Sequence, residues 1–153
     1  MTSTKPLHVF CYGSLRPDDD TGMPWTKSAV QGMRAQRASV FGAKLYNDEY
    51  AALVLDDSKP NSSVQGWVLT AGPVLFQKKM ETFDYIEGYE PDGNGFYQRT
   101  IKDVCLGDPD DCIGKQIGTS GDLVKCYVYH KPNCSKEVLI PSGDWLRRDE
   151  VIS

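Results

Sequence analysis

The sequence contains few of the residues that build metal sites. Its 153 residues include only two histidines, His8 and His130, far apart along the chain, and the zinc-binding pattern His-Glu-x-x-His is absent. The pattern Gly-x-Ser-x-Gly, which presents the serine nucleophile of many hydrolases, is also missing. We therefore expect no metal site built from side chains, no serine nucleophile of this type and no cofactor.

Long apolar runs and basic runs are missing as well. No stretch approaches the roughly 20 apolar residues of a membrane-spanning helix, and the apolar run Leu7–Cys11 is too short for a signal peptide. Asp and Glu (21) outnumber Lys and Arg (17), which gives a net charge of −4. This balance argues against nucleic acid or an anionic membrane as a partner. The expected location is cytoplasmic.

The cysteines do not form a disulfide framework. There are five of them, an odd number, and no Cys-x-x-Cys pair occurs. None has a clear histidine partner in the sequence, so we expect reduced, structural thiols rather than nucleophiles. The five are Cys11, Cys105, Cys112, Cys126 and Cys134.

The order of the apolar segments predicts the fold class. The length suits one domain, here residues 1–153. Six segments rich in β-branched and aromatic residues are expected strands. They do not alternate regularly with helices, which favours an α+β domain over a doubly wound parallel sheet. The segments are Leu7–Tyr12, Ala38–Tyr46, Tyr50–Leu55, Val64–Thr70, Phe96–Val104 and Leu123–Tyr129.

The strongest helix signal covers Pro73–Glu87. Proline is tolerated at a first helical position, and Gly88 stands where a left-handed glycine often ends a helix. At about 100° per residue, Glu87 falls inside the apolar stripe formed by Phe76, Met80 and Phe83. A carboxyl group there needs a partner or a raised pKa, and a raised pKa suits proton transfer near neutrality. Alternatively, Glu87 turns to solvent at the helix end or pairs with Arg99.

A second candidate feature is Tyr12-Gly13-Ser14-Leu15, which directly follows the first expected strand. A glycine at a strand end lets the chain turn sharply and lets a ligand approach the backbone closely. Backbone N–H groups in such a loop can hold a carboxylate or a developing oxyanion. An ordinary tight turn is the alternative interpretation.

These motifs together resemble the γ-glutamylcyclotransferase-like superfamily. Tyr-Gly-Ser-Leu, then Asp-x-x-Glu-Gly at a helix end, then Tyr-x-Arg at the start of a strand occur in the order typical of that family. The short length looks most like the γ-glutamylamine cyclotransferase branch. The matching segments are Val9–Pro17, Gly42–Asp57, Val64–Thr70, Phe83–Glu90, Phe96–Arg99 and Cys126–Tyr129. One departure is Tyr50-Ala51, where relatives often have Tyr-Pro.

The resemblance implies a fold, a reaction and a set of site residues. The implied fold is a small mixed β-barrel of about six strands with flanking helices. Glu87 matches the catalytic glutamate, which would act as general acid and base. The substrate-binding loop would be Tyr12, Gly13, Ser14 and Leu15, and Tyr97 matches a pocket-side tyrosine. The implied reaction converts a γ-glutamyl amine or γ-glutamyl amino acid to 5-oxoproline and a free amine, without metal or cofactor.

Several alternatives stay open at the level of sequence. An enzyme of the same fold could act on glutathione or remove a γ-glutamyl group from a biosynthetic intermediate. A non-catalytic module could bind a small molecule in the same pocket. Finally, the aromatic residues Phe96, Tyr97 and Trp145 could lie at an interface with a partner protein.

Overall fold

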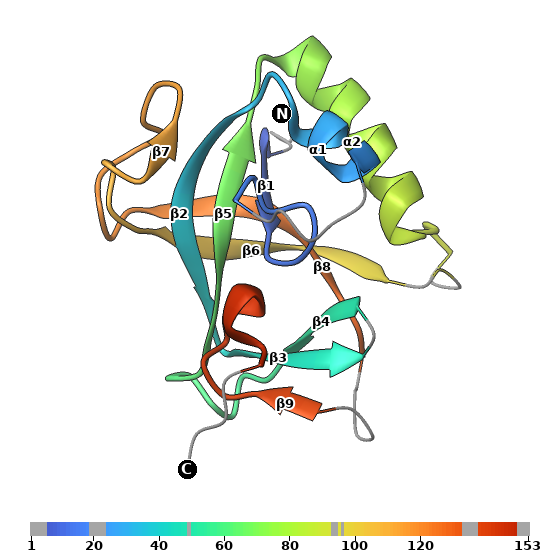
Figure 1. Ribbon diagram of the computed structural model, residues 1–153, viewed down its shortest axis with the longest axis vertical. Coiled ribbons are helices and arrows are strands. Elements are labelled where there is room, and N and C mark those ends of the chain that lie inside the picture. The colour runs from blue at the N-terminus through green and yellow to red at the C-terminus, as the bar shows by residue number, and fades with distance from the viewer. Residues whose placement is uncertain are drawn as a thin grey trace, which may run out of the picture.

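The computed structural model describes residues 6–18, 24–48, 50–92, 95, 97–132 and 138–149. Within them the chain forms β1 (His8–Cys11), α1 (Pro24–Val30), β2 (Arg34–Phe41), β3 (Ala43–Asp48), β4 (Tyr50–Leu55), β5 (Ser63–Thr70), α2 (Pro73–Glu87), β6 (Gln98–Leu106), β7 (Cys112–Ile113), β8 (Leu123–His130), β9 (Val138–Ile140) and a 3₁₀ turn (Trp145–Arg147). The helices lie at one end of the molecule and the strands β3, β4 and β9 at the other (Figure 1). No helix of the described residues is both long enough and apolar enough to cross a membrane.

Five strands close into a barrel. They follow the order β5-β1-β8-β6-β2, and the pairing of β2 with β5 closes the ring. The β1–β8 pair is parallel, whereas the other pairs of the ring are antiparallel. The short strand β7 adds to the free part of β2. The expected small mixed barrel with flanking helices is therefore confirmed, with five strands in the ring and β7 added to the same sheet.

The expected strand Ala38–Tyr46 is wrong in one respect, because it is two strands. Gly42 separates β2 from β3 and has a φ of 71°, a left-handed conformation that side chains rarely adopt. After this glycine the chain leaves the barrel and forms a separate sheet with the order β4-β3-β9. The strand β9 was not expected, because its three residues give no periodic pattern.

Helix α2 has the predicted bounds and the predicted caps. It begins at Pro73, and Gly88 ends it with a φ of 64°. The Gly88 N–H donates to the Tyr85 carbonyl oxygen at 3.2 Å, and the Tyr89 N–H donates to the Asp84 carbonyl oxygen at 2.9 Å. These two bonds satisfy carbonyl groups of the last turn, so the helix end is fixed rather than frayed.

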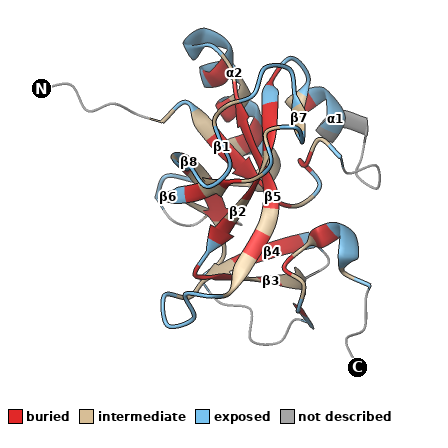
Figure 2. Ribbon diagram, turned by 90° about the vertical axis from the view of Figure 1, so that its left-hand side faces the viewer, coloured by how far each residue is buried: buried red, intermediate tan, exposed pale blue. Residues whose placement is uncertain are grey.

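Two hydrophobic clusters connect the barrel to the second sheet and to the helices. One fills the barrel and continues to the β4-β3-β9 sheet, with Phe10, Val40, Leu53, Val68 and Val128 among its members. The other lies between the outer face of the barrel and the helices. It includes the buried residues of α2, which are Phe76, Met80 and Phe83. In Figure 2, buried residues lie along the strands and on one side of α2.

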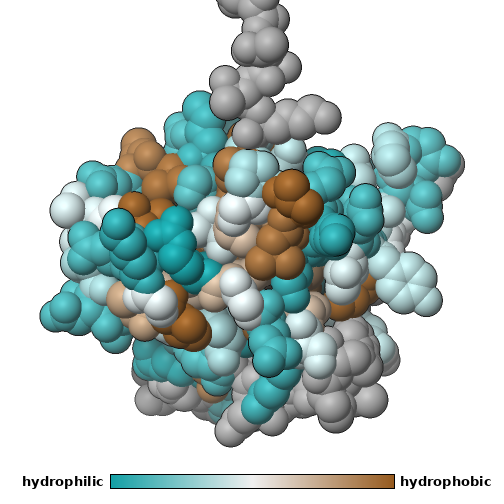
Figure 3. Space-filling model, turned by 90° about the horizontal axis from the view of Figure 1, so that it is seen from above, coloured by the Kyte–Doolittle hydropathy of each residue, from teal (hydrophilic) through white to brown (hydrophobic). Residues whose placement is uncertain are grey.

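The second cluster fixes how α2 faces the barrel. Burying a large apolar side chain contributes about 2 kcal/mol, so three of them on one stripe set the rotation of the helix firmly. The opposite face is exposed and carries Val74 and Tyr85 among polar residues. In the view from above, hydrophobic side chains lie in separate groups between hydrophilic ones (Figure 3). The last turn of α2 therefore points Glu87 toward the barrel.

Candidate active site

Glu87 lies in the last turn of α2, beside the carboxyl end of β1 and the adjoining strand β8. Its side chain is partly buried. Burial is the largest cause that raises the pKa values of the Cys11 thiol and of the Tyr12 and Tyr129 hydroxyls, and the Glu87 charge raises each of them further. The carboxyl group is therefore close to these three side chains.

Burial removes water from the Glu87 carboxyl, and no described polar group replaces the lost hydrogen bonds. Within the part of the chain that the structure describes, no group is hydrogen-bonded or ion-paired to it; Arg99, the alternative partner, binds Asp84 instead. Desolvation by burial raises the pKa of Glu87 to about 7. A carboxyl with this pKa can take a proton as carboxylate and return it as acid near neutral pH.

The loop Tyr12–Leu15 is anchored at both ends. The Tyr12 hydroxyl donates to the Tyr129 carbonyl oxygen at 2.6 Å, and Leu15 is buried against the cluster beneath α2. Between them the chain turns, with the Arg16 N–H donating to the Gly13 carbonyl oxygen at 3.0 Å. Ser14 is exposed at the tip of the turn.

The backbone donors of this loop are available for a ligand. Within the described residues, the N–H groups of Gly13, Ser14 and Leu15 make no hydrogen bond to a protein acceptor. Polar backbone groups near a partly buried site are normally paired. Three adjacent donors in one turn are suited to a carboxylate or an oxyanion.

Gly13 allows the loop to lie directly against β4. A Cβ atom at this position would lie 2.8 Å from the Cβ of Ala51, closer than side-chain carbons come in real structures. The close approach depends on the missing side chain of Gly13 and the small side chain of Ala51. The loop and β4 therefore meet here through backbone and a methyl group.

Tyr97 joins the same region from the start of β6. It is buried, and its hydroxyl donates to the Ala51 carbonyl oxygen. Burial raises the pKa of the Tyr12 hydroxyl, and Tyr97 and then Glu87 raise it further, which places the two phenol groups near each other. The structure thus brings together Tyr12, Tyr97 and Glu87 at the loop after β1.

The proposed aromatic interface is not accessible in the described residues. Trp145 and Tyr97 are both buried, and Phe96 lies outside the described residues.

An ion-pair cluster that the sequence did not predict supports the loop from outside. Arg16, 2% exposed, donates to both carboxylate oxygens of Asp18 at 2.9 Å and to Asp144 at 2.7 Å. Asp144 also accepts a hydrogen bond from the Leu146 N–H at 3.0 Å and so begins the 3₁₀ turn. The C-terminal part of the described chain is therefore tied to the residue that follows the loop.

A second unexpected cluster surrounds Asp84, one helical turn before Glu87. The Arg99 guanidinium donates to both Asp84 oxygens at 2.8 and 2.6 Å, and the Tyr129 hydroxyl donates to one of them at 2.6 Å. Asp84 and Arg99 belong to motifs recognised in the sequence. Tyr129 reaches them from β8, and nothing in the sequence assigned it to this cluster.

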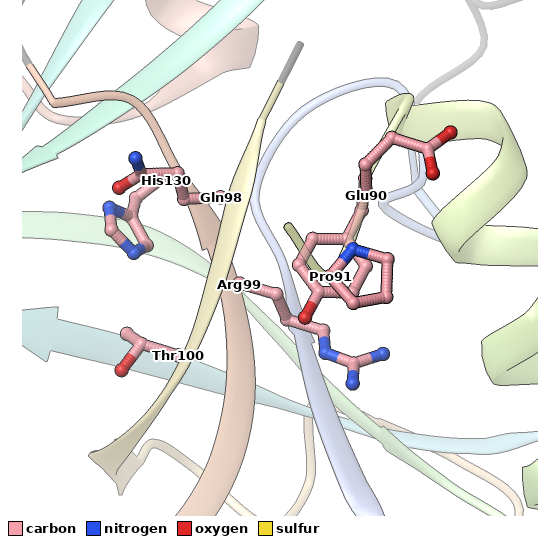
Figure 4. Close-up of a pocket in the computed structure, with 7 residues that line it drawn as sticks. Glu90, Pro91, Gln98, Arg99, Thr100 and His130 are labelled. Atoms are coloured by element: carbon pink, nitrogen blue, oxygen red, sulfur yellow. The ribbon is translucent and has the colours of Figure 1, made fainter. Parts of the chain in front are cut away.

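An open cleft of about 360 Å³ lies beside this cluster. Arg99 points to the side of β6 where Pro91 lies, and Gln98 and Thr100 point to the other side (Figure 4). Glu87 is not among the described residues that line the cleft. Its lining residues are Tyr89, Glu90, Pro91, Gln98, Arg99, Thr100 and His130.

The remaining reactive side chains do not form a second site. Within the described ranges, no three His, Cys, Asp or Glu residues gather in a way that could hold a metal ion. Cys11 and Cys126 are free and buried, and burial raises the pKa of both thiols, so both stay protonated at neutral pH. Cys134 lies outside the described residues.

Comparison with known proteins gives one family and several similar folds. A family model described as "Gamma-glutamyl cyclotransferase, AIG2-like" matches residues 9–147. No curated protein sequence matches the chain. Among solved structures, an uncharacterized protein from Pyrococcus horikoshii has a TM-score of 0.55 at 16% identity, with 91% of this chain and 89% of that chain covered.

Two further structures share the fold. An AIG2-like protein from Mus musculus has a TM-score of 0.53 at 21% identity, covering 84% of this chain and 79% of that one. A yeast γ-glutamyl cyclotransferase specific to glutathione has a TM-score of 0.50 at 12% identity, covering 81% and 68%. At these identities the likeness shows the fold alone.

Proposed function

The chain belongs to the gamma-glutamyl cyclotransferase, AIG2-like family, and from this premise we propose that it converts a γ-glutamyl amine or γ-glutamyl amino acid to 5-oxoproline and a free amine. The observation that carries the proposal is Glu87: a partly buried carboxyl, without a hydrogen-bond partner in the described residues, whose pKa burial raises to about 7. It lies beside a loop with three available backbone donors.

The substrate supplies its own nucleophile, so the protein needs to provide only a proton carrier and a fixed geometry. The α-ammonium group first releases one proton to solvent. The free amine nitrogen then attacks the δ-carbonyl carbon, a five-membered ring closes, and the Glu87 carboxylate takes a proton from the attacking nitrogen. Glu87 next gives this proton to the leaving nitrogen as the old carbon–nitrogen bond breaks.

The Gly13–Leu15 loop would donate hydrogen bonds to the oxygen atoms of the substrate. Its N–H groups can bind the α-carboxylate or stabilise the carbonyl oxygen as negative charge develops there. Either contact also folds the flexible γ-glutamyl chain so that amine and carbonyl meet, and such orientation supplies much of the rate in ring closures. Tyr12 and Tyr97 would close the pocket against water.

A substrate panel tests the proposal. The purified protein is incubated without added metal with γ-glutamyl-ε-lysine, γ-glutamylalanine and glutathione, and 5-oxoproline is quantified. Glutathione belongs in the panel because the yeast enzyme with the same fold is specific to it. We expect product from at least one compound with the wild type, and a loss of at least about 100-fold in Glu87→Gln.

The matched control is Glu81→Gln, which removes an exposed carboxyl from the same helix and should keep full activity. Near-normal turnover by Glu87→Gln would refute the role of Glu87. If 5-oxoproline bound to the protein but no compound were cyclised, the alternative of a non-catalytic binding module would replace the proposal.

A further inference from the structure

The carboxylate of Asp84, one helical turn before Glu87, holds two donors from the neighbouring strands β6 and β8. The first is the Arg99 guanidinium from β6, bound to both oxygens at 2.8 and 2.6 Å. The second is the Tyr129 hydroxyl from β8, bound at 2.6 Å. Burial opposes the charge of Arg99, but Asp84 outweighs it and raises the pKa of the guanidinium. Asp84 thus keeps a positive charge in a partly buried position.

The Tyr129 hydroxyl belongs to the surroundings of Glu87, and the Arg99 guanidinium packs on Tyr89, just beyond the helix end. The Tyr129 hydroxyl responds to the Glu87 charge, which is among the causes that raise its pKa after burial and Asp84. The Arg99 guanidinium lies 4.5 Å from the ring centre of Tyr89, two residues beyond Glu87, and 4.6 Å from that of Tyr127. Each donor is nevertheless directed to Asp84.

We propose that Asp84 is a positioning residue for the cyclisation: it holds the Arg99 guanidinium and the Tyr129 hydroxyl, so that the Glu87 carboxyl stays free to take and return a proton. This inference rests on the proposed function of Glu87.

The charges around Glu87 explain why Arg99 must stay bound to Asp84. Among the described residues, the titratable groups whose pKa values are raised by the Glu87 charge are Cys11 and Tyr12 from β1 and its loop and Tyr129 from β8, all of which are uncharged at neutral pH. Asp84, one helical turn before Glu87, forms an ion pair with Arg99 of β6. A guanidinium that left Asp84 for Glu87 would hold the carboxylate in its charged form. The proton needed by the leaving amine would then be lost.

The test is the pKa of Glu87 itself, measured by ¹³C NMR of the side-chain carboxyl in the protein without substrate. In Asp84→Asn, Arg99 loses its counter-charge, and we expect the pKa of Glu87 to fall by about one unit, a tenfold smaller protonated fraction above that pKa. In Arg99→Gln, Asp84 is left uncompensated, and we expect a rise. In the double variant both charges are gone, and the pKa should return to near 7. Glu81→Gln is the matched control and should cause no change.

Opposite shifts in the two single variants, with recovery in the double variant, support the proposal. Shifts in the same direction, or no shift in either, overturn it, because the proposal requires the Arg99 charge to act on Glu87 once Asp84 no longer holds it. If Asp84→Asn fails to fold, a rise of the Glu87 pKa in Arg99→Gln supports the proposal, and no shift or a fall overturns it. The NMR titration needs no turnover. An inactive wild type therefore refutes the proposed function, whereas an active protein with an unchanged Glu87 pKa refutes the role of Asp84.

Discussion

The raised pKa of Glu87 predicts that folding stability depends on pH in a specific direction. In the folded protein the pKa is about 7, above the ordinary value of 4.5. The folded state therefore holds this proton more tightly than the unfolded chain. The resulting stabilisation is fully present below pH 4.5 and is lost as the pH rises through 7.

The size of the effect follows from the two pKa values. Between pH 5 and pH 8 the ionisation of Glu87 should lower the free energy of unfolding by about 2.5 kcal/mol. In a domain of this length that corresponds to a fall in Tm of roughly 5–10 °C. The Glu87→Gln variant lacks the group, so its stability relative to the wild type should improve by the same amount over this range.

The assay is urea unfolding of the wild type and Glu87→Gln at pH 5, 6, 7 and 8. All other titrating groups are shared, so the difference between the two curves isolates Glu87. We expect the difference to change by about 2.5 kcal/mol, mostly below pH 7. Parallel curves would show that Glu87 titrates alike in the folded and unfolded states, and the argument from its burial would then be wrong.

Two further predictions concern the loop after β1. Gly13→Ala should reduce kcat/KM at least about tenfold, because the added methyl group would lie 2.8 Å from the Cβ of Ala51; Gly13→Ala combined with Ala51→Gly should recover most of the loss, and no recovery would contradict the steric explanation. Asp144→Asn should lower the free energy of unfolding by about 2 kcal/mol, because it leaves one side of the buried Arg16 guanidinium without a counter-charge. Lys125→Gln, which breaks an exposed pair, should cost less than about 0.5 kcal/mol in the same urea titration; equal losses would refute the argument from burial.

The parts of the fold that depend on local signals could be predicted from the sequence. Helix α2 has its expected bounds because Pro73 and Gly88 act within their own turns. The strand β4 also has the expected bounds, Tyr50–Leu55, because its apolar run is short and bounded by polar residues. The barrel itself came from the resemblance, since periodicity does not say which strands pair. The closing β2–β5 pairing joins residues far apart in the chain.

The parts of the site that depend on contacts between distant segments could not be predicted. The position of Glu87 on the apolar stripe was visible in the sequence because it depends on helical geometry alone. By contrast, the sequence suggested Glu87 as a partner for Arg99, and only the fold shows that Arg99 pairs with Asp84 instead. The Arg16–Asp144 pair spans 128 residues and leaves no periodic trace. The break at Gly42 was missed because an apolar run continues on both sides of it.

The central claim is that the product forms by ring closure and not by hydrolysis. The most direct measurement is mass spectrometry of the products from the preferred compound of the substrate panel, with the reaction run in water enriched in ¹⁸O. We expect 5-oxoproline and free amine in equal amounts, with no ¹⁸O in the 5-oxoproline. Glutamate carrying ¹⁸O would mean that water attacks the carbonyl carbon, and it would contradict the account.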